Sequence, residues 1–255
     1  MHQTTEHSWV NSNSRIAVIT GGGTGVGAAV AHALAEETTT ICLIGRRLEA
    51  LETVAAKARG LGAEAICYSA DLASESGQLE LARRLTSELP HVDVLVQNAA
   101  MCVPGSVDRA CLEDFDRHYR TNVRAPYVLT KALLPLLKAR RGQVVFINSS
   151  SGINAKPLSA QYDSTKHALR AIADSLRAEV NAVGIRVLSV YLGRIATDMQ
   201  ARLRQVAGRP YRPELLLQPQ DVASVIRNAL DLPRTAEVTD VHIRPMIDPR
   251  RSGQP

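Results

Sequence analysis

The chain has 255 residues, of which 45% are apolar and 22% are charged, and its formal net charge is +5. That length and apolar content suffice for one α/β domain with a large core. Aromatic residues make up only 4% of the chain and no block of like charges occurs, so we expect no nucleic-acid partner. No apolar run approaches the roughly 20 residues that span a bilayer, so we expect no membrane partner either.

The ends and the cysteines give further expectations. Segment 1–14 is polar and lacks the basic and apolar regions of a signal peptide, so we interpret it as a polar N-terminal tail. The rest, 15–255, is expected to form a single domain. The cysteines show no metal-ligand spacing, which predicts buried free thiols, no metal site and a cytoplasmic location. They are Cys42, Cys67, Cys102 and Cys111.

Short apolar runs alternate with segments of helical periodicity along the whole chain. Strands are expected at 15–20, 40–45, 65–70, 92–97, 143–149, 185–191 and 238–243. Helices are expected at 25–37, 47–60, 74–89, 109–139 (with breaks near Pro126 and Pro135), 159–183 and 219–231. This alternation predicts an α/β fold, a doubly wound Rossmann-type parallel sheet of about seven strands with helices on both faces.

The first expected strand runs directly into a glycine-rich loop, Gly21-Gly22-Gly23-Thr24-Gly25-Val26-Gly27, and a helical pattern follows. Glycines permit a tight turn and close backbone approach, and a helix N-terminus offers free N–H groups with a partial positive charge. The order strand, glycine loop, helix therefore predicts a site for a dinucleotide pyrophosphate. The spacing is T-G-x-x-x-G-x-G rather than the general G-x-G-x-x-G fingerprint.

Tyr162 and Lys166 stand four residues apart in an expected helix, so both side chains lie on one helix face. A free tyrosine has a pKa of about 10, too high for ready proton exchange at neutral pH. A cation nearby favours the phenolate and lowers that pKa, which would make Tyr162 a usable general acid and base. The spacing alone also fits an ordinary surface pair.

The glycine loop and this pair together resemble the short-chain dehydrogenase/reductase family, from about Ile16 to Pro245. The resemblance implies hydride transfer between NADP(H) or NAD(H) and a small-molecule carbonyl compound or secondary alcohol. It implies cofactor contacts from Thr20, Gly21, Thr24, Gly25, Val26, Gly27, Asp71, Leu72, Asn98, Ala99, Tyr162, Lys166, Ile195 and Thr197. For Asp71, the residue pattern leaves open the alternative of a cap for the following helix.

The family's catalytic serine and asparagine match Ser149, thirteen residues before Tyr162, and Asn122, twenty-seven residues before Ser149. By this resemblance Tyr162 donates the proton and Lys166 lowers its pKa and contacts the nicotinamide ribose. Ser149 then polarises the substrate oxygen, and Asn122 holds a water that relays protons. Two departures from the family pattern are Ala100 in place of glycine and Leu192 in place of proline.

The residues after the second strand indicate which cofactor binds. An NAD-selective fold places an acid there to accept from the ribose 2′-hydroxyl, but this chain has Gly45 followed by Arg46 and Arg47. A guanidinium can bind a 2′-phosphate through paired charge-assisted hydrogen bonds, so we predict NADP(H) with Arg46 as the main contact. NAD(H) stays possible, because both arginines could be solvated residues at a helix start.

A homodimer or homotetramer is expected, because family members commonly pair through the helices that correspond to 109–139 and 159–183. Apolar residues on the second helix cover more than one of its faces. They are Ala168, Leu169, Ile172, Ala173 and Leu176.

Segment 192–218 is expected to form a small flap over the substrate, because it follows the sixth strand. Its arginines are Arg202, Arg204, Arg209 and Arg212. They either face solvent, the interpretation we favour, or face the cavity and favour anionic substrates. Two alternative functions stay open: a cofactor-binding sensor or scaffold without catalysis, and an epimerase or dehydratase of the same fold.

Overall fold

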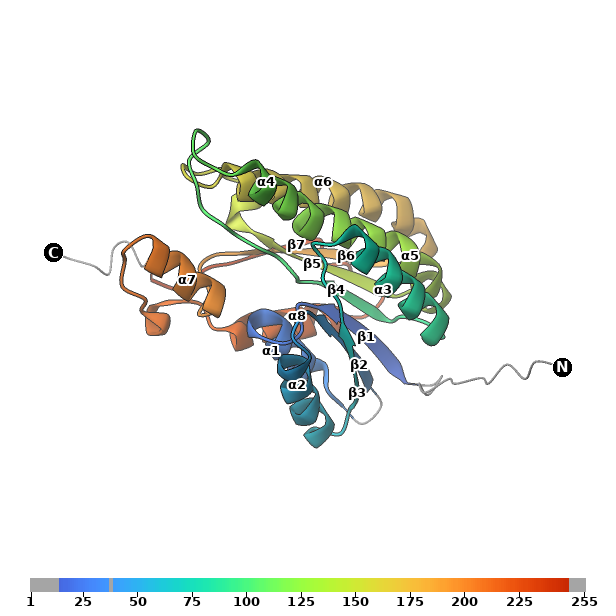
Figure 1. Cartoon of the computed structure of the whole chain (residues 1–255). Helices are drawn as coiled ribbons and strands as arrows, with labels where there is room; N and C mark the ends of the chain where they lie inside the picture. Colours follow the sequence, from blue (N-terminus) through green and yellow to red (C-terminus); the bar gives the residue numbers. More distant parts are fainter. Residues whose placement is uncertain (1–13, 37–38, 248–255) are drawn as a thin grey trace.

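In the computed structural model, which describes residues 14–36 and 39–247, the strands form one sheet in the order β3-β2-β1-β4-β5-β6-β7 (Figure 1). All neighbouring strands pair in parallel, as the alternation of strands and helices predicts. The strands are β1 (Arg15–Thr20), β2 (Thr39–Gly45), β3 (Glu64–Ser69), β4 (Val94–Gln97), β5 (Gln143–Ser149), β6 (Arg186–Leu192) and β7 (Asp240–Ile243).

Helices cover both faces of the sheet (Figure 1). One layer holds α1, α2 and α8, and the other holds α3, α5 and α6, while α7 lies beside the sheet. The helices are α1 (Gly25–Leu34), α2 (Leu48–Gly60), α3 (Glu75–Glu88), α4 (Leu112–Tyr119), α5 (Ala125–Arg140), α6 (Ala160–Val180), α7 (Asp198–Val206) and α8 (Pro219–Leu230).

The side-chain alternation of β1 shows why the sheet needs both layers. Ala17 and Ile19 pack into the core beneath α1, α2 and α8, whereas Ile16 and Val18 pack into the core beneath α3, α5 and α6. A strand that is apolar on both faces is stable only when both faces are covered, which is the usual state of a parallel sheet. The doubly wound fold is therefore confirmed.

The expected helix 109–139 is divided differently from the prediction. It consists of α4, a π-helical turn at Arg120–Arg124, and α5. Pro126 lies in the first turn of α5, where a missing N–H has no consequence. Pro135 lies inside α5 without ending it, so the break expected there is wrong. The segment after β6 contains a helix, α7, which the list of expected helices does not include.

Most of the expected tail, 1–13, lies outside the described residues, but Ser14 belongs to the folded domain. Its side chain is buried, with Oγ 3.0 Å from Oγ1 of Thr40, and its carbonyl oxygen lies 3.0 Å from Nε2 of His91. The four cysteines are free thiols, as predicted, but only Cys42 is buried: Cys67 and Cys102 are half-buried and Cys111 is exposed, so the expected burial is wrong for these three. Among the described residues there is no cluster of three metal-ligating side chains and no helix long and apolar enough to cross a membrane.

Candidate active site

A cavity of about 870 Å³ opens at the carboxyl ends of the strands. Ligands of doubly wound sheets bind at this edge, because the loops that leave the strands diverge there. The residues expected at these ends all line the cavity, namely Gly21, Arg46, Asp71, Asn98 and Ser149. Of the residues that the sequence proposes for cofactor contact or catalysis, only Thr20, Gly27 and Asn122 do not line it.

Thr20 and Gly27 shape the glycine loop from behind. The Thr20 hydroxyl is buried and accepts the backbone N–H groups of Asn98 (2.9 Å) and Ala99 (3.0 Å), which ties the end of β1 to the end of β4. The Asn98 amide donates to the carbonyl oxygens of Thr20 (2.9 Å) and Gly21 (3.1 Å). A Cβ atom at Gly27 would lie 2.3 Å from the Gly21 carbonyl oxygen, so only glycine fits here.

The N-terminus of α1 faces the cavity without a side-chain cap. Thr24 occupies the N-cap position but makes no side-chain hydrogen bond, and the first turn contains no acidic residue. The N–H groups of this turn are therefore available to an anion, and the helix dipole favours one. Gly25, at φ +57°, allows the turn into the helix. The features needed to hold a pyrophosphate are thus present.

Arg46 and Arg47 lie at the other end of the cavity, between β2 and α2. Both are exposed, and within the described residues neither guanidinium bonds to another side chain. Gly45 ends β2 where an acid would be needed for NAD selectivity. Asp71 lines the same end and accepts the Ala73 N–H at 3.0 Å, so it closes the turn before α3 rather than capping that helix. The cap of α3 is Ser74.

Ser149, Tyr162 and Lys166 converge at the centre of the cavity. Ser149 ends β5, and Tyr162 and Lys166 lie on the first turns of α6. The Lys166 ammonium is 3% exposed, donates to the Ile147 carbonyl oxygen at 2.9 Å, and lies 5.7 Å from the centroid of the Tyr162 ring. Burial lowers the pKa of Lys166 to about 8. The ammonium is therefore able to release a proton near neutral pH.

The prediction that Lys166 lowers the pKa of Tyr162 stays a prediction, because burial has the largest effect on this pKa. Burial raises the pKa of Tyr162 above its ordinary value, the Cys102 thiol adds to the rise, and a hydrogen bond with Ser149 acts against it. The Lys166 ammonium lies 5.7 Å from the Tyr162 ring centroid and donates to the Ile147 carbonyl oxygen rather than to the phenol. Tyr162 is consequently a neutral phenol at physiological pH, the form that donates a proton.

Asn122 lies beneath the cavity, in the π-helical turn before α5. Its Oδ1 accepts the Met101 N–H at 2.8 Å, and its Nδ2 donates to the Met101 carbonyl oxygen (3.0 Å) and to Thr165 Oγ1 (3.1 Å). The side chain is 1% exposed, and these bonds use both Nδ2 hydrogens and one of the two lone pairs of Oδ1. Asn122 therefore ties the loop after β4 to α6. π-Helical turns occur often at functional sites.

The flap begins with a short bridge between Ile195 and Leu217. Thr197 caps α7 by accepting the Gln200 N–H at 3.4 Å, and its methyl group would lie 3.2 Å from a Cβ atom at Gly25. The flap thus reaches the glycine loop. The flap residues that line the cavity are mostly apolar or neutral, namely Arg194, Ile195, Thr197, Asp198, Met199, Gln200, Leu203, Val206 and Ala207.

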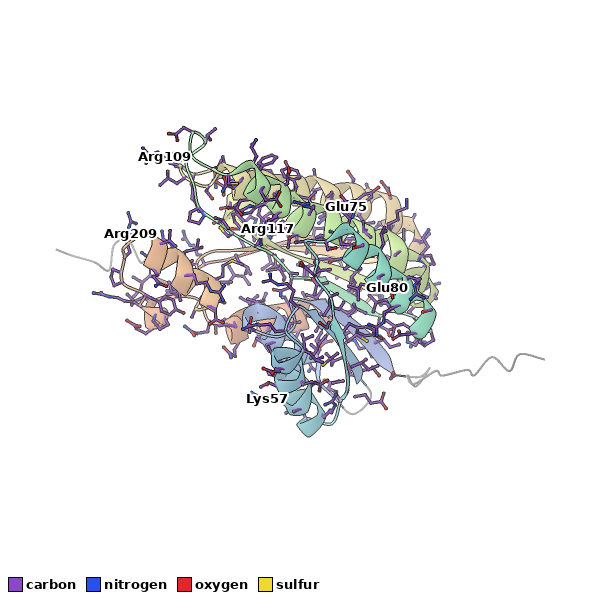
Figure 2. All side chains as sticks on the ribbon, in the orientation of Figure 1. Lys57, Glu75, Glu80, Arg109, Arg117 and Arg209 are labelled. Atoms are coloured by element: carbon purple, nitrogen blue, oxygen red, sulfur yellow. The ribbon has the colours of Figure 1, made fainter. Side chains whose placement is uncertain are left out.

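The four arginines named from the sequence do not line the cavity, so the solvent-facing interpretation is the one that the geometry favours. They are Arg202, Arg204, Arg209 and Arg212. Figure 2 shows Arg209 at the outer end of the flap.

The sequence interpretation assigned no role to Asn148. Asn148 is buried, accepts the Ser149 N–H at 2.8 Å and donates to the Lys166 carbonyl oxygen at 3.2 Å, so it joins β5 to α6 beside the reacting groups. A Cβ atom at Gly152 would lie 2.6 Å from Asn148 Oδ1. The only sequence signal was a polar residue at the end of an apolar strand. Lys156, also missed, lines the cavity in the following loop.

Comparison with known proteins agrees with this fold. Residues 15–207 match the family model described as short chain dehydrogenase, and the chain belongs to this family of oxidoreductases. An uncharacterised oxidoreductase of Staphylococcus epidermidis is 28% identical over 91% of this chain and 97% of its own length.

Two solved structures extend the comparison. An alcohol dehydrogenase from the archaeon Thermococcus sibiricus, complexed with 5-hydroxy-NADP, has a TM-score of 0.82 and 25% identity and covers 91% of this chain and 97% of its own. A metagenomic short-chain oxidoreductase in complex with NADP has a TM-score of 0.78 and 26% identity, with coverage of 93% and 100%.

Proposed function

We propose that this protein is an NADP(H)-dependent oxidoreductase that interconverts a carbonyl compound and a secondary alcohol. The observation that carries the proposal is one continuous cavity that contains an uncapped helix N-terminus, two unpaired arginines, and the Ser149, Tyr162 and Lys166 side chains. The first two features suit a phosphorylated dinucleotide, and the last suits proton transfer to an oxygen atom.

The residues that would hold the dinucleotide follow the strand ends. The first turn of α1 would bind the pyrophosphate, Arg46 would bind the 2′-phosphate, and Asn98 would support the loop between them. Two solved relatives contain NADP or a derivative of it, which supports NADP(H) over NAD(H). When bound, NADPH supplies the hydride for the carbonyl carbon of the substrate.

The protein's own part in the reaction is to orient the substrate oxygen and to protonate it. Ser149 would hold this oxygen by a hydrogen bond, and Tyr162 would donate its proton as negative charge develops there. The raised pKa of Tyr162 keeps the phenol protonated at neutral pH, which suits the reduction direction. Lys166, with its pKa lowered to about 8, would replace the proton that Tyr162 gives up.

Asn122 would hold the loop after β4 against the helix that carries Lys166. Its side chain fixes Met101, in the loop after β4, to Thr165, one residue before Lys166. In a π-helical turn the backbone hydrogen bonds join residues five apart instead of four. Backbone carbonyl groups of this turn would therefore be able to hold a water that exchanges protons with Lys166. The proton relay predicted from the sequence thus stays a prediction.

Assembly through the α4, α5 and α6 face is also part of the proposal. Leu112 is 81% exposed, Phe115 is 41% exposed and Tyr127 is 55% exposed, which is unfavourable for a face that stays in water. The apolar residues of α6 named from the sequence differ in burial. Leu169, Ala173 and Leu176 are buried, whereas Ala168 and Ile172 are only half-buried. We infer a homodimer or homotetramer from the exposed apolar side chains of Leu112, Phe115 and Tyr127.

A turnover assay with the Tyr162→Phe variant tests the proposed function. Wild-type protein should oxidise NADPH when given members of a panel of ketones and aldehydes, and should reduce NADP with the matching alcohols at alkaline pH. Tyr162→Phe keeps the ring that packs and removes the proton donor, so it should bind NADPH normally and lose nearly all turnover. A variant with near-normal kcat would refute the assigned role, and no turnover by wild type on any carbonyl compound would refute the function.

A further inference from the structure

Lys156 is an exposed residue that adds a positive charge to the lining of the cavity that holds the reacting groups. Its side chain lines the cavity, and its Nζ lies 3.4 Å from Oγ of Ser150, the residue that follows Ser149. Within the part of the chain that the structure describes, this is the only side-chain bond of Lys156, so no carboxylate neutralises the ammonium. An ammonium in this position is available to a ligand.

The loop that carries Lys156 is held by a buried carboxylate. Asp163 is 1% exposed, and its two oxygens accept the Lys156 backbone N–H at 2.6 Å and the Ser159 hydroxyl at 2.8 Å. Between these two contacts Leu158 adopts φ +63°, a left-handed conformation that is uncommon for leucine, and its carbonyl oxygen accepts the Gly105 N–H at 3.0 Å. Such backbone conformations persist where the surroundings over-determine them, and they cluster at ligand sites.

The charges around this end of the cavity are mostly positive. Arg117 on α4 and Arg194 at the start of the flap line it together with Lys156, while Asp198 is the acidic residue of the flap that lines it. Arg117 also pairs with Asp114 at 3.3 Å, so part of its charge is neutralised on its own helix. Figure 2 shows Arg117 below α4, on the side that faces α7, whereas Arg109 and Arg209 lie at the outer ends of their segments.

Apolar side chains also line this end. Met199, Leu203 and Val206 line it from α7, and Leu158 lines it from the opposite loop. A ligand that fits this lining has an uncharged aliphatic part, an oxygen that reaches Ser149 and Tyr162, and a negative group close to them. Charge-assisted hydrogen bonds from an ammonium to a carboxylate or phosphate are stronger than those between neutral groups.

We propose that Lys156 binds an anionic group of the substrate, so that the protein acts on carbonyl compounds that carry a carboxylate or a phosphate. The inference rests on the proposed function, because it names the substrate class of the same site. Asp163 is a positioning residue in it, since Asp163 holds the loop and does not itself face the ligand.

Matched acid and ester substrates test the proposal kinetically. NADPH oxidation is measured with 4-oxopentanoate and with methyl 4-oxopentanoate, and in a second arm with dihydroxyacetone phosphate and with dihydroxyacetone, which separates carboxylate from phosphate. In Lys156→Gln the loss of kcat/KM for the preferred anion should exceed the loss for its neutral partner by about ten-fold or more. Lys156→Arg keeps the charge and should retain most of the preference.

Arg209→Ala is the matched control, because it removes one positive charge from an exposed residue that does not line the cavity. It should leave the ratio of anionic to neutral kcat/KM unchanged. An equal shift of this ratio in Arg209→Ala and Lys156→Gln would mean that the effect is a long-range one of net charge, and would overturn the assignment to Lys156.

A binding measurement separates this inference from the function on which it rests. Calorimetry compares pentanoate with pentanamide, and propyl phosphate with propanol, on protein saturated with NADP. Tighter binding of an anion, lost in Lys156→Gln and kept in Arg209→Ala, would support the anion site even if no carbonyl compound were reduced. Equal binding of anionic and neutral ligands, with neutral ketones still reduced, would overturn the inference and leave the proposed function standing.

Discussion

Replacing Gly27 by alanine would place a methyl carbon 2.3 Å from the Gly21 carbonyl oxygen and 2.6 Å from the Asn98 side-chain nitrogen. Neither neighbour can move freely, because Asn98 donates to the carbonyl oxygens of Thr20 and Gly21 and so ties both strand ends together. Overpacking of this kind costs about 1–3 kcal/mol, and a broken hydrogen bond adds about 1 kcal/mol. We therefore expect Gly27→Ala to lower the free energy of unfolding by about 2–4 kcal/mol.

For a chain of this length each kcal/mol shifts the unfolding midpoint by about 2–4 °C, so Tm should fall by roughly 10 °C. Gly60→Ala is the matched control. Gly60 ends α2, a Cβ atom there would meet no atom within 4 Å, and alanine is the better helix former by up to about 1 kcal/mol. The control should therefore leave Tm unchanged or slightly higher.

Differential scanning calorimetry with and without NADPH is the assay. A ligand that binds only the folded protein raises Tm, so the size of the rise reports whether the cofactor site is intact. In Gly27→Ala the methyl group forces α1 away from the Gly21 turn, which displaces the N–H groups that would hold the pyrophosphate. The rise should therefore disappear in this variant and persist in Gly60→Ala. A Gly27→Ala protein with the wild-type Tm and the wild-type response to NADPH would refute the reasoning.

The remaining predictions concern the cofactor, pH and assembly. Arg46→Ala should weaken NADPH binding about ten-fold or more while changing NADH binding little, as measured by fluorescence titration, since only NADPH carries the 2′-phosphate; equal losses would contradict its role. Burial lowers the pKa of His118, whose neutral Nε2 accepts the Val103 N–H at 3.0 Å. The imidazole of His118 binds a proton more readily in the unfolded chain than in the folded protein. The contribution of neutral His118 to the free energy of unfolding is therefore complete above the unfolded pKa of about 6.5, and it is lost as pH falls towards the folded pKa. Urea unfolding at pH 7.5 and 5.5 should show a smaller acid loss in His118→Gln than in wild type, and identical losses would count against this. Light scattering at micromolar concentration should give a dimer or tetramer, and Phe115→Glu should shift it towards monomer; a wild-type monomer would contradict the proposed interface.

Local patterns in the sequence were sufficient for the fold and for much of the site. The apolar runs before Gly21 and before Ser149 predict strands that the structure confirms as β1 and β5. Because parallel strands end at the same edge of a sheet, the polar residues that follow them had to lie together. Tyr162 and Lys166 share a helix face because residues four apart lie on the same side of an α-helix. These inferences need only the local geometry of strands and helices and the common edge at which parallel strands end.

What the sequence could not supply is the direction of side chains and the partners that each group finds across the fold. Asn122 is occupied by Met101 and Thr165, which lie 21 and 43 residues away, so its side-chain role followed only from packing. The pKa of Tyr162 rises because the effect of burial outweighs that of the hydrogen bond with Ser149.

The sequence also could not show which basic side chains face the part of the cavity around Ser149 and Tyr162. The flap arginines and Lys156 are all basic residues in loops or at a short helix, and no pattern distinguishes them along the chain. The tertiary structure directs Lys156 into the cavity, because the buried Asp163 carboxylate fixes its loop, and leaves Arg209 outside. Such selection depends on how each loop packs in the folded chain, which is why the sequence pattern does not decide it.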